Sequence, residues 1–252
     1  QTGSLFKLFV YLNGFEHGLK ISDVFVDEPI AVKDWYPENY GKKYYGNIDL
    51  KSAFSLSSNS VAVQIAEYFG VNNLIDLAVK MGITSKFEQN DLTITLGTTA
   101  INLLEMVKAF AIVNNGGYDV ETNTIRYIFK NQNDILYEYK RRDNKKLLSD
   151  YSVNSTKELL YYTIVSGTGQ NAKVQKLIDK TENYNKYNKN KKFFIGGKTG
   201  SSQNNVDAWF IGFANDLTIC IWMGNDDNTP TNNLMGGNLP AILWKQIVER
   251  LN

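Results

Sequence analysis

Three short groups of serine, lysine and small residues in this 252-residue chain could carry nucleophilic chemistry. Ser4 and Lys7 form the first group, three residues apart in the sequence Gly-Ser-Leu-Phe-Lys. If this segment is helical, the hydroxyl and the amine share one face. A serine needs a base, and lysine can serve only when its pKa is lowered towards neutrality. The pair therefore predicts a serine activated by a lysine; the simpler alternative makes Ser4 a helix N-cap and Lys7 a solvated charge.

The second group is Ser57 and Asn59, in a polar run at 55–60. Apolar residues then recur every four positions up to Gly70, which predicts a helix with this serine and asparagine at its entrance. Both residue types cap helix N-termini, so capping is one interpretation and a second polar group of a site is the other.

The third group is Lys198, Thr199, Gly200 and Ser201, directly after the apolar and glycine residues at 193–197. The apolar run predicts a buried strand, and the glycines open its edge to a ligand because no side chains stand behind it. Lys-Thr-Gly alone is a weak signal, and an exposed lysine is usually a solvated charge.

The rest of the pattern predicts the elements that would position these groups. Alternating apolar residues at 207–213, a turn at 215–216 and an apolar run at 217–223 predict two strands beside the Lys-Thr-Gly strand. Apolar spacing predicts further elements: helices at 3–14, 61–69, 71–81, 99–114, 155–165 and 240–251, and a peripheral hairpin at 125–139. Residues 21–50 and 179–192 lack such spacing and are expected to form a surface excursion and a mobile loop.

Three of these helices carry finer predictions. The helix at 99–114 is expected to bury Leu103 and Leu104, and the C-terminal helix to bury Ile242 and Leu243. Residues 155–158, Ser-Thr-Lys-Glu, match a capping box and are expected to begin the helix that ends near Gly167.

The composition argues against several classes of function. With 43% hydrophobic and 21% charged residues, the chain is typical of one large globular domain, with a division into two lobes as the alternative. A net charge of +1 gives no electrostatic footprint for nucleic acid. The one cysteine, Cys220, and the one histidine, His17, exclude a zinc site built from those ligands and argue against a serine–histidine triad. No metal or cofactor is predicted, because the acidic run at 225–230 lacks the spacing of a calcium loop.

No stretch approaches the roughly 20 apolar residues of a membrane span, and no signal peptide is recognisable. Because the chain begins with Gln1 and a candidate site follows within three residues, we expect a fragment of a longer protein.

The three groups stand in the order Ser-x-x-Lys, Ser-x-Asn, Lys-Thr-Gly, which resembles the serine penicillin-recognising superfamily. Other stretches look like the transpeptidase domain of class A, bifunctional penicillin-binding proteins: Leu96-Gly97-Thr98, Ser166-Gly167-Thr168-Gly169, Asp207-Ala208-Trp209-Phe210 and Trp222-Met223-Gly224-Asn225-Asp226-Asp227. This resemblance extends from Gly3 nearly to Asn252. It is less close in two places, with Leu8 where the family commonly has proline and Ser201 where it commonly has threonine.

The resemblance implies an α+β fold in which helices flank an antiparallel sheet beside an all-helical lobe. Residues 1–252 would form one transpeptidase domain, with the helical lobe at about 50–117, the hairpin at about 118–141 and the sheet strands at about 193–224. Family members also carry sheet strands before the catalytic serine, and further upstream a glycosyltransferase domain and a membrane anchor. We therefore expect missing N-terminal strands and an extracytoplasmic location on the cytoplasmic membrane.

The implied activity is that of a D,D-transpeptidase that cross-links peptidoglycan stem peptides and is acylated by β-lactams. By resemblance, Ser4 is the nucleophile, Lys7 the base and Lys198 the charge opposite it. Ser57 would pass a proton to the leaving D-alanine, and Asn59 would contact Lys7 and the substrate backbone. At the Lys-Thr-Gly-Ser strand, Thr199 and Ser201 would hold the substrate carboxylate beside Gly200. Division or elongation proteins are possible partners.

Two alternatives remain open. A D,D-carboxypeptidase or β-lactamase of the same fold would use water in place of the acceptor amine, although Glu105 is better explained as a helix residue than as the glutamate of a class A β-lactamase. A non-catalytic module that binds cell-wall peptides or β-lactams is the other, but it would need no activated serine.

Overall fold

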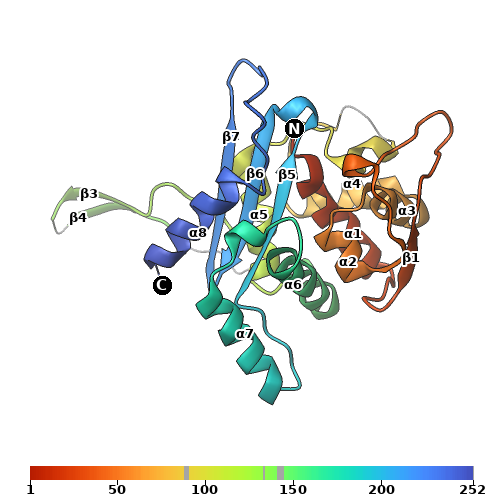
Figure 1. Cartoon of the computed structure of the whole chain (residues 1–252). Coiled ribbons are helices and arrows are strands. Elements are labelled where there is room, and N and C mark those ends of the chain that lie inside the picture. The colour runs from red at the N-terminus through yellow and green to blue at the C-terminus, as the bar shows by residue number, and fades with distance from the viewer. Residues whose placement is uncertain (88–90, 133, 141–144, 252) are drawn as a thin grey trace.

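The three-stranded antiparallel sheet at the centre of the molecule is flanked by helices on both faces (Figure 1). A computed structural model describes residues 1–87, 91–132, 134–140 and 145–251. The sheet is a meander of β5 (Ile195–Ser201), β6 (Asp207–Ala214) and β7 (Leu217–Gly224) in the order β5-β6-β7. All eight residues of β6 are buried because this strand has a neighbour on each side and helices on both faces. The three strands predicted around the Lys-Thr-Gly group are present.

Helix α8 (Leu239–Leu251) packs on β6 and β7. The opposite layer contains α5 (Leu103–Asn114), which contacts β7, and α6 (Asp150–Val165), which contacts β5. Further helical elements of the chain are η3 (Leu92–Leu96), η4 (Gln170–Ala172), α7 (Gln175–Tyr187) and η5 (Gln203–Asn205).

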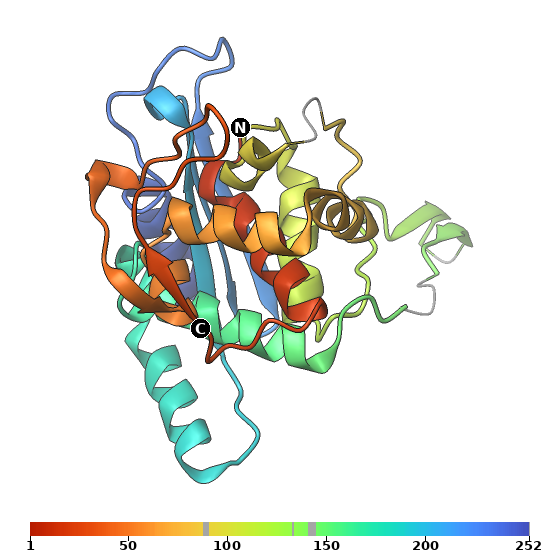
Figure 2. The same cartoon turned by 90° about the vertical axis from the view of Figure 1, so that its right-hand side faces the viewer.

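The first helical segment runs through the centre of the fold. A 3-10 turn, η1 (Gly3–Phe6), continues into α1 (Lys7–Glu16), and every residue from Lys7 to Phe15 is buried. A helix that is apolar on nearly all sides belongs in a core. In Figure 2, α1 crosses the view between the sheet and helix α3 (Asn59–Phe69). The helix extends past Gly14, where the sequence predicted its end.

A second group of elements surrounds α1. Two strands, β1 (Val24–Asp27) and β2 (Gly46–Asp49), pair antiparallel within the stretch that lacked a pattern, and η2 (Tyr40–Lys42) lies between them. Helices follow in quick succession: α2 (Leu50–Ser55), α3 (Asn59–Phe69) and α4 (Val71–Lys80). The observed architecture confirms the predicted α+β class, with helices around an antiparallel sheet.

Several local predictions were wrong. Helix α6 begins at Asp150 with Ser149 as its N-cap, so the capping-box pattern at 155–158 lies inside the helix. The segment predicted as a mobile loop is largely helix α7. At α5, which begins at Leu103 and not at Thr99, Leu103 and Leu104 are exposed. At α8 the buried residues are Pro240, Ala241, Trp244 and Val248, whereas Ile242 and Leu243 lie near the surface.

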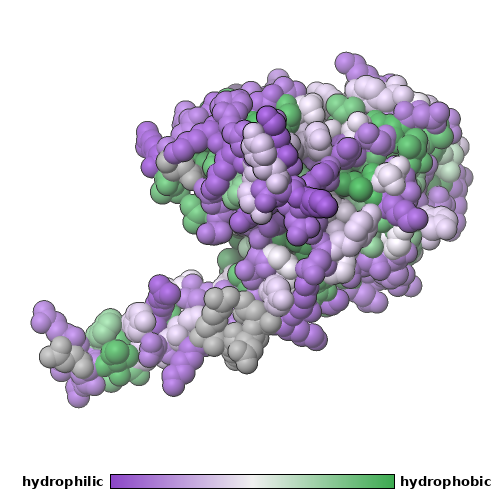
Figure 3. All heavy atoms as spheres, turned by 90° about the horizontal axis from the view of Figure 1, so that it is seen from below, coloured by the Kyte–Doolittle hydropathy of each residue, from purple (hydrophilic) through white to green (hydrophobic). Residues whose placement is uncertain are grey.

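The predicted peripheral hairpin is present as β3 (Tyr127–Asn131) and β4 (Asp134–Glu138). Every residue of both strands is exposed, including Phe129 and Leu136. The space-filling view of Figure 3 shows the hairpin as an arm that leaves the body and carries apolar side chains near its end.

Candidate active site

The turn that carries Ser4 is pressed against the end of strand β5. Gly3 has a φ of +52°, and a Cβ on it would lie 2.3 Å from the Ser201 carbonyl oxygen. Gly97 also has a positive φ, and its Cβ would lie 2.1 Å from the Gly3 carbonyl oxygen. Only glycine fits at such contacts. Ser4, half-buried, is therefore held between the Lys-Thr-Gly strand and the loop after η3.

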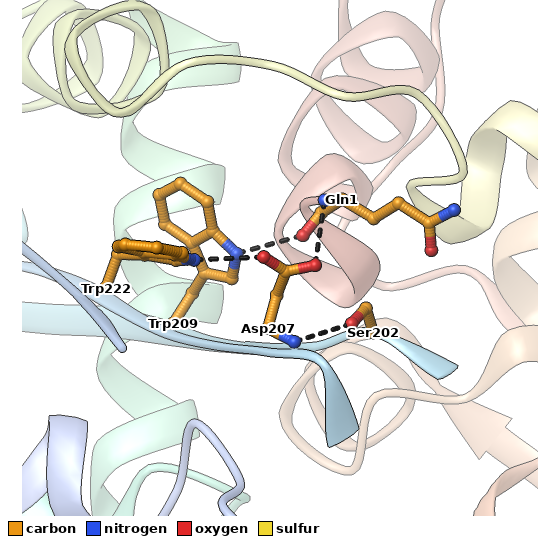
Figure 4. Close-up of polar contacts among 5 residues, drawn as sticks. All are labelled: Gln1, Ser202, Asp207, Trp209 and Trp222. Carbon is orange, nitrogen blue, oxygen red and sulfur yellow. Dashed lines mark hydrogen bonds and ion pairs between the residues drawn. The ribbon is translucent and has the colours of Figure 1, made fainter. Parts of the chain in front are cut away.

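Residue Gln1, just before this turn, is held against the sheet by hydrogen bonds (Figure 4). Its backbone nitrogen donates to the Asp207 carboxylate at 2.9 Å, and its carbonyl oxygen accepts from Trp209 Nε1 at 2.9 Å. Trp222 Nε1 donates to the other Asp207 oxygen at 3.0 Å. Two strands of the sheet thus fix the chain three residues before Ser4.

Lys7 has a fully buried ammonium that is completely hydrogen-bonded. Its Nζ donates to the Ser57 carbonyl at 2.7 Å, to Ser57 Oγ at 3.2 Å and to Asn59 Oδ1 at 2.6 Å. An ammonium has three N–H groups, so these acceptors use all of them. Ser4 precedes Lys7 by three residues, on the 3-10 turn that continues into α1. A lone pair for the Ser4 proton becomes available only when Lys7 is neutral.

Ser57 reaches Lys7 because of the way helix α2 ends. The bonds Ser58 N to Ala53 O and Ser57 N to Phe54 O form a Schellman motif. The left-handed position of that motif, usually glycine, is here Ser57 with a φ of +61°. The next residue, Ser58, is already the N-cap of α3 and accepts from Val61 N. This turn between two helices points the Ser57 hydroxyl at Lys7.

Lys198 approaches the same hydroxyl from strand β5. Its Nζ lies 3.0 Å from Ser57 Oγ and 5.5 Å from the centre of the Phe54 ring, and the side chain is fully buried. A serine oxygen accepts two hydrogen bonds and donates one. With both amines on its lone pairs, Ser57 keeps its own proton to donate elsewhere.

Burial lowers the pKa of both lysines, and a nearby charge contributes at Lys7. Burial brings the pKa of Lys198 to about 7. Burial, followed by the nearby positive charge of Lys198, holds the pKa of Lys7 well below its usual value, while the Asp27 carboxylate partly opposes this. Burial therefore makes a neutral amine accessible in this network, near pH 7 at Lys198.

The remaining residues of the strand are arranged as a binding edge. Thr199 Oγ1 lies 2.7 Å from Thr168 Oγ1 in the loop after α6. Ser201 Oγ accepts from Gly236 N at 3.0 Å, which leaves its proton free to donate. A Cβ on Gly200 would lie 2.5 Å from the Thr2 carbonyl oxygen, so this strand and the Ser4 turn touch through backbone.

The structure thus joins Lys7, Ser57, Asn59 and Lys198 in one hydrogen-bonded network, beside Ser4 and the binding edge. Sequence reasoning missed Thr168 as a partner of Thr199. It also missed Asn39, whose side-chain oxygen accepts from Asn59 N at 2.7 Å. The segment around Asn39 has no apolar periodicity, and only the neighbouring Pro37 and aromatic residues distinguished it.

Other candidate groups have structural roles. His17 ends helix α1, and its Nδ1 lies 2.8 Å from the Asn13 carbonyl oxygen. Glu105 lies in α5 and accepts hydrogen bonds from Thr84 and Ser85, as expected of a helix residue. Burial raises the pKa of the Cys220 thiol to about 12. Among the described residues, no cluster of three or more His, Cys, Asp or Glu side chains has the geometry of a metal site.

A hollow of about 800 Å³ lies outside this network. It is bordered by α5, the foot of the hairpin and the turn before β7, and Glu121, Tyr139 and Asp216 line it. None of the three sequence groups contributes to it. Helices able to span a bilayer are absent from the described ranges.

Comparison with known families and proteins gives a consistent result. A family model described as the penicillin binding protein transpeptidase domain matches residues 1–249. Penicillin-binding protein 1A of Rickettsia felis is 30% identical over 243 residues, which cover 90% of this chain and 30% of that protein. The protein of the same name from Neisseria meningitidis is 26% identical and matches 97% of this chain and 30% of its own length. The chain therefore spans under a third of these relatives.

Solved structures share the fold. Penicillin-binding protein 1A from Haemophilus influenzae superposes with a TM-score of 0.85 at 22% identity, covering 100% of this chain and 42% of that chain. PonA1 of Mycobacterium tuberculosis, solved in complex with penicillin V, gives a TM-score of 0.83 at 19% identity, covering 100% of this chain and 69% of that one. Since the family model matches nearly every residue, this chain belongs to the family of penicillin-binding protein transpeptidase domains.

Proposed function

We propose that this chain is a serine D,D-transpeptidase that cross-links peptidoglycan stem peptides through an acyl-enzyme on Ser4. The observation that carries the proposal is the network in which Lys7, three residues after Ser4 on the same helical segment, and Lys198 lie within hydrogen-bond distance of the Ser57 hydroxyl. A site of this kind supplies a nucleophile, a base with a lowered pKa and a route for a proton.

In the acylation step, the Ser4 oxygen attacks the carbonyl carbon of the penultimate D-alanine, and its proton passes to neutral Lys7. The backbone N–H groups of Ser4 and Ser201 stabilise the oxyanion, and the Thr199 and Ser201 hydroxyls hold the terminal carboxylate. When the peptide C–N bond breaks, the leaving amine of D-alanine takes a proton through Ser57. Asn59 Nδ2 donates one of its two N–H groups to the Glu38 carbonyl, which fixes the amide so that its oxygen accepts from Lys7 and orients it.

In the second step, the amine of another stem peptide attacks the ester carbon and Ser4 regains its proton. A β-lactam enters the first step in the same way, since opening its ring breaks an amide C–N bond while the ester on Ser4 forms. The leaving nitrogen stays attached to the acyl group and occupies the acceptor path. We infer that the adduct is long-lived.

The wider context is also a proposal. The relatives are about three times as long as the matched region, which supports a larger protein with a glycosyltransferase domain and a membrane anchor outside residues 1–252. That arrangement would place the domain outside the cytoplasm, where peptidoglycan lies and where division or elongation proteins are available as partners.

Intact mass after incubation with benzylpenicillin tests the nucleophile. We expect the chain to gain the mass of one penicillin and Ser4→Ala to gain none, with both proteins folded by circular dichroism. A Ser201→Ala protein, in which Ser4 remains, is the matched control and should still be labelled, more slowly. An adduct on Ser4→Ala would refute the assignment of the nucleophile.

Product analysis with stem-peptide donors and acceptors distinguishes the reaction types. A transpeptidase forms a cross-linked dimer that grows with acceptor concentration, whereas a carboxypeptidase releases D-alanine without a dimer. Rapid return of the penicillin adduct to free enzyme would indicate a β-lactamase. The fully hydrogen-bonded Glu105 argues against such a deacylating base at that position.

A further inference from the structure

Behind the Ser57 turn lies a carboxylate that the proposed mechanism does not use. Asp27, the last residue of β1, is completely buried. Its Oδ1 accepts from Asn39 Nδ2 at 2.8 Å and from Ser58 Oγ at 2.7 Å, and its Oδ2 accepts from Tyr45 N at 3.2 Å. These three donors are neutral. Burying a carboxylate without a bonded cation costs free energy, so the presence of Asp27 at this position calls for a physical reason.

Asn39 connects this carboxylate to the start of helix α3. Its Nδ2 donates to Asp27 and to the Lys43 carbonyl at 2.9 Å, which fixes the orientation of the amide. Its Oδ1 then faces the helix and accepts from Asn59 N at 2.7 Å and Ser60 N at 3.1 Å. These are backbone groups of the first helical residues, which have no partner within the helix.

Ser58 makes a second connection. Its hydroxyl donates to Asp27 and its oxygen accepts from Val61 N at 3.0 Å. Because Asp27 takes the proton, the lone pair of the hydroxyl is directed at the helix. The carboxylate therefore sets the orientation of both Asn39 and Ser58, and these two side chains hold the first backbone N–H groups of α3, directly after Ser57.

We propose that Asp27 and Asn39 are positioning residues for acylation: they hold the left-handed Ser57 turn so that the Ser57 hydroxyl and the Asn59 amide oxygen meet Lys7. This inference rests on the function proposed above. A side chain at φ +61° other than glycine is strained and persists only where its surroundings over-determine it. The two residues supply that restraint from elements outside the three sequence groups.

The charge of Asp27 also acts on Lys7. The charged groups that face Lys7 are Lys198 from β5 and Asp27 from β1. Tyr11, one turn along α1, remains neutral because burial and the same carboxylate raise its pKa. Asp27 favours the ammonium form of Lys7, so removing its charge lowers the pKa of Lys7. The neutral base then forms at lower pH.

The test is the second-order rate of acylation by a fluorescent penicillin, measured from pH 5.5 to 9 for wild type, Asp27→Asn and Asn39→Ala. In Asp27→Asn the introduced amide oxygen still accepts from Asn39 and Ser58 at the Oδ1 position, so this variant removes the charge and the bond from Tyr45 N but keeps the contacts that orient the turn. We expect the rising limb of its profile of acylation rate against pH to move to lower pH by on the order of one unit. Asn39→Ala should lower the acylation rate by about 100-fold, because the Ser57 turn is displaced. The rising limb of its profile should stay at the wild-type pH, since the charge of Asp27 is kept.

Glu105→Gln is the matched control. Glu105 is also a buried carboxylate held by neutral donors, Thr84 and Ser85, but it does not contact the turn. It should lower the melting temperature without changing the acylation rate or its pH limb. If Asn39→Ala fails to fold, the test rests on the pH dependence of acylation in Asp27→Asn, because this variant keeps the size of the side chain.

The outcomes separate the two proposals. A wild-type chain that forms no adduct overturns the proposed function, and this inference with it. A wild-type chain that is acylated, together with an unmoved limb in Asp27→Asn and a normal rate in folded Asn39→Ala, overturns the positioning role alone.

Discussion

The conformation of one residue, Ser57, connects strain to chemistry in this site. The left-handed backbone costs roughly 1 kcal/mol or more for a residue with a Cβ. In exchange, the side chain leaves the end of α2 towards the two lysines, and its oxygen lies 3.2 Å from Lys7 Nζ and 3.0 Å from Lys198 Nζ. A glycine would suit the turn better and could do no chemistry.

We therefore expect Ser57→Gly to be more stable than Ser57→Ala by about 1 kcal/mol, because only glycine relieves the strain. Both variants lose the hydroxyl, so both should be acylated by penicillin at least about 100-fold more slowly than wild type. Urea unfolding and acylation rates check the two statements. Equal stability of the glycine and alanine proteins would show that the turn is not strained.

The two strands of the peripheral hairpin consist entirely of exposed residues, in contrast to the strands of the central sheet. The hairpin leaves the body where Tyr139 N donates to the Arg126 carbonyl at 2.8 Å. This hydrogen bond pairs the two segments that lead into and out of the hairpin, so their separation is the one that a two-residue turn needs. The arm is thus separable from the sheet and from the candidate site.

Replacing residues 127–138 with Asn-Gly should leave the free energy of unfolding within about 0.5 kcal/mol of wild type, since the arm buries little surface. The rate of penicillin acylation should also be unchanged. Chemical denaturation and the fluorescent penicillin assay check these outcomes. A large loss of stability would mean that the arm packs on the body in solution.

The molecule as a whole buries several amines, and this links its stability to pH. Burial lowers the pKa of Lys198 to about 7 and that of Lys157 to about 8, and the pKa of Lys7 is lowered as well. Between these values and the usual lysine pKa of about 10.4, the unfolded chain binds more protons than the folded one. Stability must then rise with pH in that window.

We expect the melting temperature to increase from pH 7 to pH 9 in a buffer of constant ionic strength. The increase should be smaller in Lys198→Met, which has no proton to release at this position. Above pH 9 the trend should weaken, because the raised pKa of Cys220 acts in the opposite direction. A melting temperature that falls steadily across pH 7–9 would contradict the buried, neutralised amines.

Sequence alone determined which residues are chemically capable and most of the elements that hold them. Ser4 with Lys7, and the Lys-Thr-Gly strand with its meander, are local: their spacing of three or two along the chain fixes which side chains share a face. Their roles as nucleophile, base and binding edge remain predictions. The local errors arose where periodicity was weak or misleading, as in the polar helix α7 and on the outward face of α8.

Tertiary structure alone decided how the groups meet. Lys7 and Ser57 are 50 positions apart, and Ser57 and Lys198 are 141 apart. No local pattern records contacts of that range, because they depend on how three elements pack around α1. The same holds for Asp27 and Asn39, whose segment has no periodicity and gains its order from hydrogen bonds to α3. Burial, which lowers the pKa of the lysines, is likewise a property of the assembled core.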